Sequence, residues 1–224
     1  MQKLLIKGGK KLSGEVVVSG SKNASLPIII SSLLFDDAAQ FENVPKVKDI
    51  YTLINLIKVL GREVEFDEHK EVLKISKKKR DKYFAPYSIM KTMRAGVLVL
   101  APLLAKFGKA KVSLPGGCSI GARPVNLHLY ALKKLGAKIN VKNGYIDANA
   151  PRGLSGANIK FPTISVGATE SIIIAAVLAK GVTKISNAAL EPEIIDLIKF
   201  LNKCGADIQY NLKRKIVIKG VKFL

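Results

Sequence analysis

The chain has 224 residues, of which 48% are hydrophobic and 24% are charged, as is usual for a folded domain. Its 37 basic residues outnumber 17 acidic ones, and the net charge of +20 favours anionic partners. No apolar run reaches the length of a membrane span, and the first residues lack the features of a secretory signal. We therefore expect no membrane partner.

The charge pattern and the cysteines narrow the function classes further. The lysines are spread along the chain, and only Lys77–Arg80 forms a dense run. Tryptophan is absent and aromatic residues make up 6%, so platforms for stacking bases are poorly supplied and we expect no nucleic-acid partner. Cys118 and Cys204 stand in different contexts and do not make a disulfide framework. A reducing, cytoplasmic location is the simplest expectation.

In chain order, one pattern of elements recurs three times. Each copy opens with an apolar helix, predicted at Ser21–Phe35, Arg94–Phe107 and Thr169–Lys180. A short strand follows, predicted at Ala39–Pro45, Ala110–Leu114 and Thr183–Asn187. An amphipathic helix then ends before a glycine, at Lys48–Leu60, Pro124–Leu135 and Pro192–Cys204. Each copy closes with a strand pair, at Arg62–Phe66 with Val72–Ser76, Ala137–Val141 with Tyr145–Ala148, and Ala206–Tyr210 with Lys215–Lys219.

This repeat predicts an α/β (α+β) lobe with approximate threefold symmetry over residues 21–220. The three copies span about 21–78, 92–150 and 167–220. The first helix of each copy is apolar all round and must be buried, whereas the second alternates and covers the outside. Residues 1–20 are predicted to hold two extra strands, Leu4–Lys7 and Gly14–Ser19, joined by a turn at Gly8–Gly9.

The stretch Leu114–Leu127 (LPGGCSIGARPVNL) carries the clearest chemical signal. Its glycines allow a backbone that closes against a ligand, and Arg123 can grip a phosphate or carboxylate through two parallel hydrogen bonds. Cys118 beside such charge would reach the thiolate more easily than a free cysteine. The alternative is a glycine-rich turn with a small buried thiol and a surface arginine.

Five segments together resemble the UDP-N-acetylglucosamine enolpyruvyl transferase family across essentially the whole chain. They are Ser19–Pro27 (SGSKNASLP), Lys91–Ala95 (KTMRA), Leu114–Leu127, Ser165–Thr169 (SVGAT) and Asn187–Ile194 (NAALEPEI). The resemblance implies transfer of the enolpyruvyl group of phosphoenolpyruvate to the 3-hydroxyl of UDP-N-acetylglucosamine, the committed step of peptidoglycan synthesis. It also implies an inside-out α/β barrel lobe, with residues 1–20 packing on a second lobe.

The resemblance further implies roles for individual residues. Cys118 matches the proton donor to the enol carbon, which is the target of fosfomycin. The implied phosphoenolpyruvate-binding residues are Lys22, Asn23, Cys118 and Arg123. The implied UDP-sugar-binding residues are Arg94, Arg123, Pro124, Val125, Asn126, Leu127, Thr163, Ile164, Ser165, Val166 and Gly167. No cofactor or metal is implied.

Other chemistry-bearing residues have structural interpretations. His69 and His128 have no partner at metal or catalytic spacing. Glu191 and Glu193 flank Pro192 and suit a first helical turn. Ser165–Thr169 is alternatively a plain turn in which Thr169 caps the following helix.

The chain departs from the family pattern in length and at three positions. Family members have two lobes, and we expect this chain to be a truncated form with weak or no turnover, lacking the second-lobe aspartate and arginines. Asn126, Thr163 and Leu190 stand where an aspartate, a lysine and a basic residue are common in the family. The alternatives are a non-catalytic UDP-sugar-binding module and, ranked lower, a nucleic-acid binder. The uncovered lobe face would attract a second lobe or a second copy.

Overall fold

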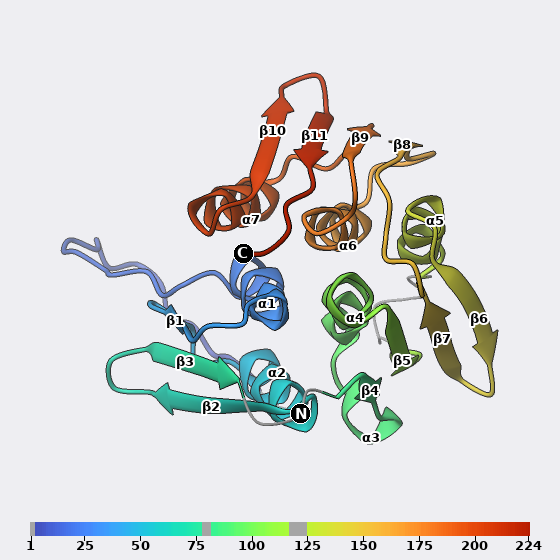
Figure 1. Cartoon of the computed structure of the whole chain (residues 1–224). Helices are drawn as coiled ribbons and strands as arrows, with labels where there is room; N and C mark the ends of the chain where they lie inside the picture. Colours follow the sequence, from blue (N-terminus) through green and yellow to red (C-terminus); the bar gives the residue numbers. More distant parts are fainter. Residues whose placement is uncertain (1–2, 78–81, 117–124) are drawn as a thin grey trace.

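The computed structural model describes residues 3–77, 82–116 and 125–224, and Figure 1 shows them as one lobe with helices at its centre. Helices from different parts of the chain lie side by side at its centre, and further helices and the sheets lie around them (Figure 1). Within these ranges no helix is both long and apolar enough to cross a lipid bilayer.

The first copy of the repeat follows the predicted order. Its elements are α1 (Lys22–Ser31), the 3-10 helix η1 (Ser32–Leu34), β1 (Ala39–Phe41), α2 (Lys48–Val59), β2 (Arg62–Asp67) and β3 (Val72–Lys77). Two short elements, β4 (Phe84–Ala85) and α3 (Tyr87–Met90), connect it to the second copy. The connector that the sequence predicts around residues 81–87 therefore carries a strand of its own.

The second and third copies repeat this order. The second consists of the 3-10 helix η2 (Arg94–Val99), α4 (Leu100–Phe107), β5 (Lys109–Ser113), α5 (Asn126–Lys134), β6 (Lys138–Lys142) and β7 (Tyr145–Asn149). After β8 (Asn158–Lys160), the third consists of α6 (Val166–Ala176), β9 (Val182–Ser186), α7 (Pro192–Lys203), β10 (Asp207–Asn211) and β11 (Lys215–Lys219). The predicted α/β lobe with a threefold repeat is confirmed.

The first sheet has one strand fewer than the other two. The first has the order β1-β3-β2, whereas the others have four strands in the orders β4-β5-β7-β6 and β10-β11-β9-β8. The extra strands β4 and β8 run parallel to β5 and β9, and every other described pair is antiparallel. Each extra strand comes from the chain just ahead of the copy whose sheet it joins.

The first helices form the core, as their composition predicts. Every residue of α6 from Ala168 to Ala176 is buried, and α4 packs against α6. The second helices bury one face, as in α7, where Ile194, Leu197, Ile198 and Leu201 point inward. The prediction of a continuous helix over Arg94–Phe107 is wrong in its first half, because Pro102 has no N–H to donate to Leu98 and the chain stays 3-10 up to Val99.

Residues 3–20 differ from the prediction, because the structure places no strand there. Seven apolar side chains in this segment are exposed: Leu4, Leu5, Ile6, Leu12, Val16, Val17 and Val18. The segment projects from the lobe at the left of Figure 1, in dark blue. A strand needs a partner edge for its backbone groups, and residues 3–20 pair with no described strand of the lobe.

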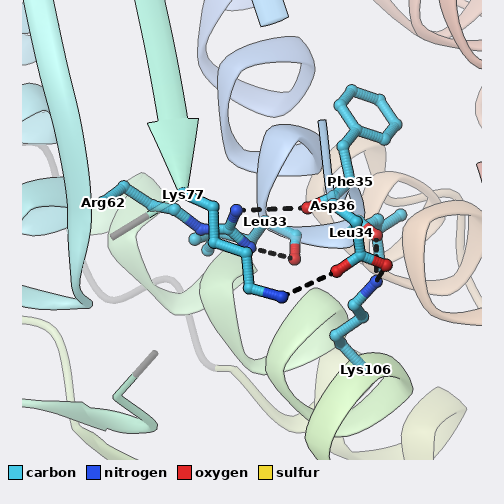
Figure 2. A network of polar contacts seen from close by, with 7 residues as sticks. All are labelled: Leu33, Leu34, Phe35, Asp36, Arg62, Lys77 and Lys106. Carbon is cyan, nitrogen blue, oxygen red and sulfur yellow. Dashed lines mark hydrogen bonds and ion pairs between the residues drawn. The ribbon is translucent and has the colours of Figure 1, made fainter. Parts of the chain in front are cut away.

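The C-terminal end of the first central helix is held by cations, of which Arg62 is buried (Figure 2). Arg62 is 2% exposed, and its guanidinium donates to the carbonyls of Leu33 and Phe35, each at 3.1 Å. Lys106 donates to the Leu34 carbonyl at 2.9 Å and pairs with Asp36 at 2.7 Å. Cations are favourable at the carbonyl-rich C-terminal ends of helices. Because Lys106 belongs to α4, this cluster joins the first copy to the second.

The junction between the first and third copies is made by side chains. Helix α1 packs against α7, and the Phe200 ring lies 6.0 Å from that of Phe35 and 5.7 Å from that of Phe41, between centroids. By contrast, the chain itself runs from the first copy to the second and from the second to the third.

Candidate active site

The N-terminal ends of the three central helical segments meet at one cavity of 430 Å³. Lys22 begins α1, Arg94 begins η2 and Val166 begins α6, and all three line this cavity. Helix starts present backbone N–H groups and partial positive charge. Together with the two cations, they make the cavity suited to a polyanion.

At the α1 wall, Ser21 is the N-cap and its Oγ accepts a hydrogen bond from the Ala24 N–H at 3.4 Å. The next residue, Lys22, pairs with Asp49 at 3.0 Å between Nζ and Oδ2. Both side chains keep contact with water, with 46% and 36% of their surface exposed. An exposed ion pair is weak, so an anionic ligand could draw the ammonium group from Asp49.

At the α6 wall, the cap is Ser165 and not Thr169. The Ser165 Oγ accepts from the Ala168 N–H at 3.3 Å, and the helix begins at Val166. Thr169 lies inside the helix, where its hydroxyl donates to the Ser165 carbonyl at 2.8 Å and accepts from the Ala189 N–H at 3.0 Å. The alternative in which Thr169 caps the helix is therefore wrong.

A buried carboxyl group, Glu170, lies in the cavity wall. It is 6% exposed although it belongs to the apolar helix α6. Burial, with a smaller contribution from the negative charge of Glu193, raises the pKa of Glu170 to about 7. Near neutral pH this group therefore exchanges a proton beside the cavity.

His128 of α5 lies in the same cavity wall, and its pKa is shifted in the opposite direction to that of Glu170. Its Nδ1 lies 2.7 Å from the Ser171 Oγ, and a Cβ added at Gly167 would come within 3.0 Å of its ring. Burial, helped by the nearby positive charge of Arg94, lowers the pKa of His128 to about 4. The imidazole is thus neutral at neutral pH, and Gly167 is needed for its close approach to α6.

Comparison with known proteins decides the family. Residues 6–224 match the family model of EPSP synthase (3-phosphoshikimate 1-carboxyvinyltransferase). The chain belongs to this family. Its structure is also similar to the enolpyruvyl transferase NikO from Streptomyces tendae, with a TM-score of 0.79 and 21% identity over 96% of this chain and 50% of that one. EPSP synthase from Acinetobacter baumannii gives a TM-score of 0.76 at 18% identity, over 94% of this chain and 48% of that one.

Sequence relatives are much closer and carry a different name within the EPSP synthase family. UDP-N-acetylglucosamine 1-carboxyvinyltransferase from Pelagibacter ubique is 58% identical over 224 residues, which is 100% of this chain and 53% of that protein. The protein of the same name from Geotalea uraniireducens is 54% identical over the same shares. The chain therefore spans about half the length of the curated relatives it matches.

The EPSP synthase fold brings together seven of the residues that the sequence singles out. The cavity is lined by Lys22, Asn23, Arg94, Val125, Ser165, Val166 and Gly167. Asn126, Leu127, Thr163 and Ile164 do not line it, and Thr163 and Ile164 are exposed beside the start of α6. Cys118, Arg123 and Pro124 lie outside the described residues. Their implied roles remain predictions.

Three titratable residues of the cavity were not among the predicted site residues. Asp49 and Glu170 were not singled out, and His128 was given a structural role. Glu170 offered one signal, because a carboxylate inside an otherwise apolar helix needs a reason to be there. Within the described ranges no group of three His, Cys, Asp or Glu side chains could hold a metal ion.

Proposed function

We propose that this chain binds phosphoenolpyruvate and UDP-N-acetylglucosamine and carries the enolpyruvyl transfer by which the sugar nucleotide enters peptidoglycan synthesis. The proposal is supported by the relatives of that name at 54–58% identity. The observation that carries it is the convergence of Lys22, Arg94 and the Ser165-capped start of α6 on one cavity. With these substrates, the expected location of the protein is the cytoplasm.

The proposed reaction needs a cationic site because both substrates are anions. The 3-hydroxyl oxygen of the sugar would give its proton to a base, which the family resemblance places in the second lobe, and bond to C2 of phosphoenolpyruvate while C3 takes a proton. The C2–O bond to phosphate then breaks, inorganic phosphate leaves, and the proton gained at C3 is lost to restore the enol ether. Lys22 and Arg94 would neutralise charge in the bound state, and backbone N–H groups at the α1 and α6 starts would bind oxyanions.

The proposed acid is Cys118. A thiol with a pKa near the working pH is suited to deliver a proton to carbon. Val125, which belongs to the same stretch Leu114–Leu127, lines the cavity. Arg123 in the same loop would supply a further cation to the phosphate. Second-lobe groups would complete the site in the full length of the relatives.

The test measures binding and turnover separately. Titration calorimetry with UDP-N-acetylglucosamine should give saturable binding, and phosphate release should depend on both substrates. Lys22→Ala should weaken phosphoenolpyruvate binding at least about tenfold, which corresponds to the loss of one charge-assisted contact. Lys213→Ala in the exposed β10–β11 turn is the matched control and should change nothing.

Three outcomes are informative. Robust phosphate release by the 224-residue chain would sink the expectation that it turns over weakly alone. Binding of the sugar nucleotide without phosphate release would favour the non-catalytic UDP-sugar-binding module. If neither substrate binds, and Lys22→Ala behaves like Lys213→Ala, the proposal fails.

A further inference from the structure

Glu170 of α6 lies where two cavities meet. It lines the cavity of 430 Å³ described above and also a smaller one of 330 Å³. The two cavities share further wall residues from α1, η2 and α6, such as Asn23, Ala95 and Val166, so they adjoin one another. Of the shared wall residues, Glu170 is the one with a titratable side chain.

The Glu170 carboxyl group is buried without a partner in the described part of the chain. The residue is 6% exposed, and neither a hydrogen bond nor an ion pair joins its carboxyl to another described residue. The described charge that acts on it is that of Glu193 in α7, which has the same sign and lines the smaller cavity. A buried polar group normally has a hydrogen-bond partner, so this carboxyl is available to a ligand of the cavity.

The charge of the larger cavity depends on whether Glu170 carries a proton. Lys22 and Arg94 are cationic and Asp49 is anionic, whereas burial keeps His128 neutral. The described wall therefore has a net charge of +1 when Glu170 is protonated, and no net charge when it is ionised. The described residues of α4 and β11, which also pack against α6, line neither cavity. Protonated Glu170 thus favours an anionic ligand, and it has an O–H donor that the carboxylate lacks.

We propose that Glu170 binds the anionic ligand of this cavity as a neutral acid, donating its O–H to a phosphate or carboxylate oxygen of the ligand. The inference rests on the proposed function, which supplies phosphoenolpyruvate as that ligand. Where Glu170 is ionised beforehand, one of its oxygens takes a proton from the solvent as the anion binds, and no other bond changes. Protonation therefore strengthens anion binding by the same factor by which the anion strengthens protonation.

The test measures phosphoenolpyruvate binding by calorimetry between pH 6 and 9, in the wild type and in Glu→Gln variants. In the wild type the dissociation constant should rise above pH 7 by up to about tenfold per pH unit, because a proton must first be bound. Glu170→Gln keeps an uncharged donor at every pH and should lose this rise. The titration of the ligand and of other cavity groups is common to both proteins and cancels in the ratio of their constants.

The matched control is Glu65→Gln. It removes the same charge from an exposed residue of β2, and its dissociation constants should follow those of the wild type. Glu193→Gln keeps Glu170 in place but removes the like charge, so its dissociation constant should begin to rise at a lower pH than in the wild type. An unchanged onset in Glu193→Gln overturns the proposal, and this variant decides the matter if Glu170→Gln does not fold.

Proton uptake gives a second measurement. Titrations at pH 8 in buffers of different ionisation enthalpy should show about one proton more taken up per anion in the wild type than in Glu170→Gln. A carboxyl with a merely structural role would leave the two proton counts equal. Equal counts, or parallel pH profiles of the dissociation constant, overturn the proposal.

Inorganic phosphate separates this proposal from the proposed function. If phosphoenolpyruvate binds at no pH, the proposed function fails, and the same series is measured with inorganic phosphate. Phosphate affinity that falls above pH 7 in the wild type and not in Glu170→Gln supports the role of Glu170 as a neutral acid. Phosphate affinity that does not depend on Glu170, or the absence of phosphate binding, overturns it.

Discussion

The two ends of α1, the first central helix, hold cationic side chains in different environments. At the N-terminal end of α1, Lys22 and Asp49 form an ion pair that stays in contact with water at the cavity. Beyond its C-terminal end, Arg62 is buried and bound to two carbonyls, and Lys106 is bound to a third. A cation fixed by buried carbonyls stabilises the fold, whereas a cation that is loosely held remains available to a ligand.

The largest expected effect is at the buried end. Arg62→Met leaves the carbonyls of Leu33 and Phe35 without their donor, and should lower the free energy of unfolding by about 3 kcal/mol. Urea unfolding measures it. The control is Arg214→Met, because that half-buried guanidinium donates to the single carbonyl of Ala188 at 3.2 Å, and about 1 kcal/mol is expected. Equal losses in the two variants would remove the distinction between the two ends.

At the cavity end of the central helices, a rise in pH should lower the free energy of unfolding. The pKa of Glu170 is raised from 4.5 to about 7, so the unfolded chain releases its proton first and stability is lost between these values. Glu170→Gln should abolish this loss and be more stable than the wild type at pH 8, by about 3 kcal/mol. Thermal unfolding from pH 4 to 8 measures the difference.

The control for this prediction is Glu193→Gln. It removes the charge that contributes to the raised pKa of Glu170, so it should reduce the loss without abolishing it. Parallel stability curves for the wild type and Glu170→Gln over the whole pH range would refute the buried carboxyl as their cause.

A smaller effect is expected at His128, which the same cavity keeps neutral. Burial is the larger cause of its lowered pKa and the Arg94 charge the smaller, so Arg94→Met should raise the pKa of about 4 by less than about one unit. NMR titration of the ring measures this shift, and His69→Asn assigns the two histidine signals. A rise to above 6 would mean that charge, rather than burial, dominates.

The smallest change in stability should come from the exposed pair. Asp49→Asn should alter the free energy of unfolding by less than about 0.5 kcal/mol, because both partners of this ion pair are hydrated. It should nevertheless tighten the binding of phosphoenolpyruvate severalfold, since Lys22 no longer has a competing carboxylate. Calorimetry of the variant measures both quantities. Weaker binding would indicate that Asp49 positions Lys22 for the ligand.

Much of the fold could be predicted because its signals are local. Apolar helices such as α6 and glycine stops such as Gly61 after α2 recur in a fixed order. The strands β4 and β8 were missed, because two or three residues are too few to show a period. The strands expected before residue 20 do not form within the described lobe. The resemblance implies that they pack on a second lobe, so they stay a prediction.

The cavity was harder to predict, since it depends on how the copies close in space. Family resemblance pointed to Lys22, Arg94 and Ser165, but no local pattern shows that three helix starts meet at one point. Nor does it show that Glu170 and His128 share the same wall. Burial sets the pKa of both groups, and burial is a property of the assembled lobe.

The aromatic contact between α7 and the first copy has a mechanical consequence. Peptide bonds link the first copy to the second and the second to the third, whereas the described contacts between the third copy and the first are made by side chains such as Phe200. The three copies thus form an open arc whose two ends are joined by the contact between α7 and the first copy. Under force or mild denaturant, we expect this contact to break first, which would separate Lys22 from the start of α6 while every copy stays folded.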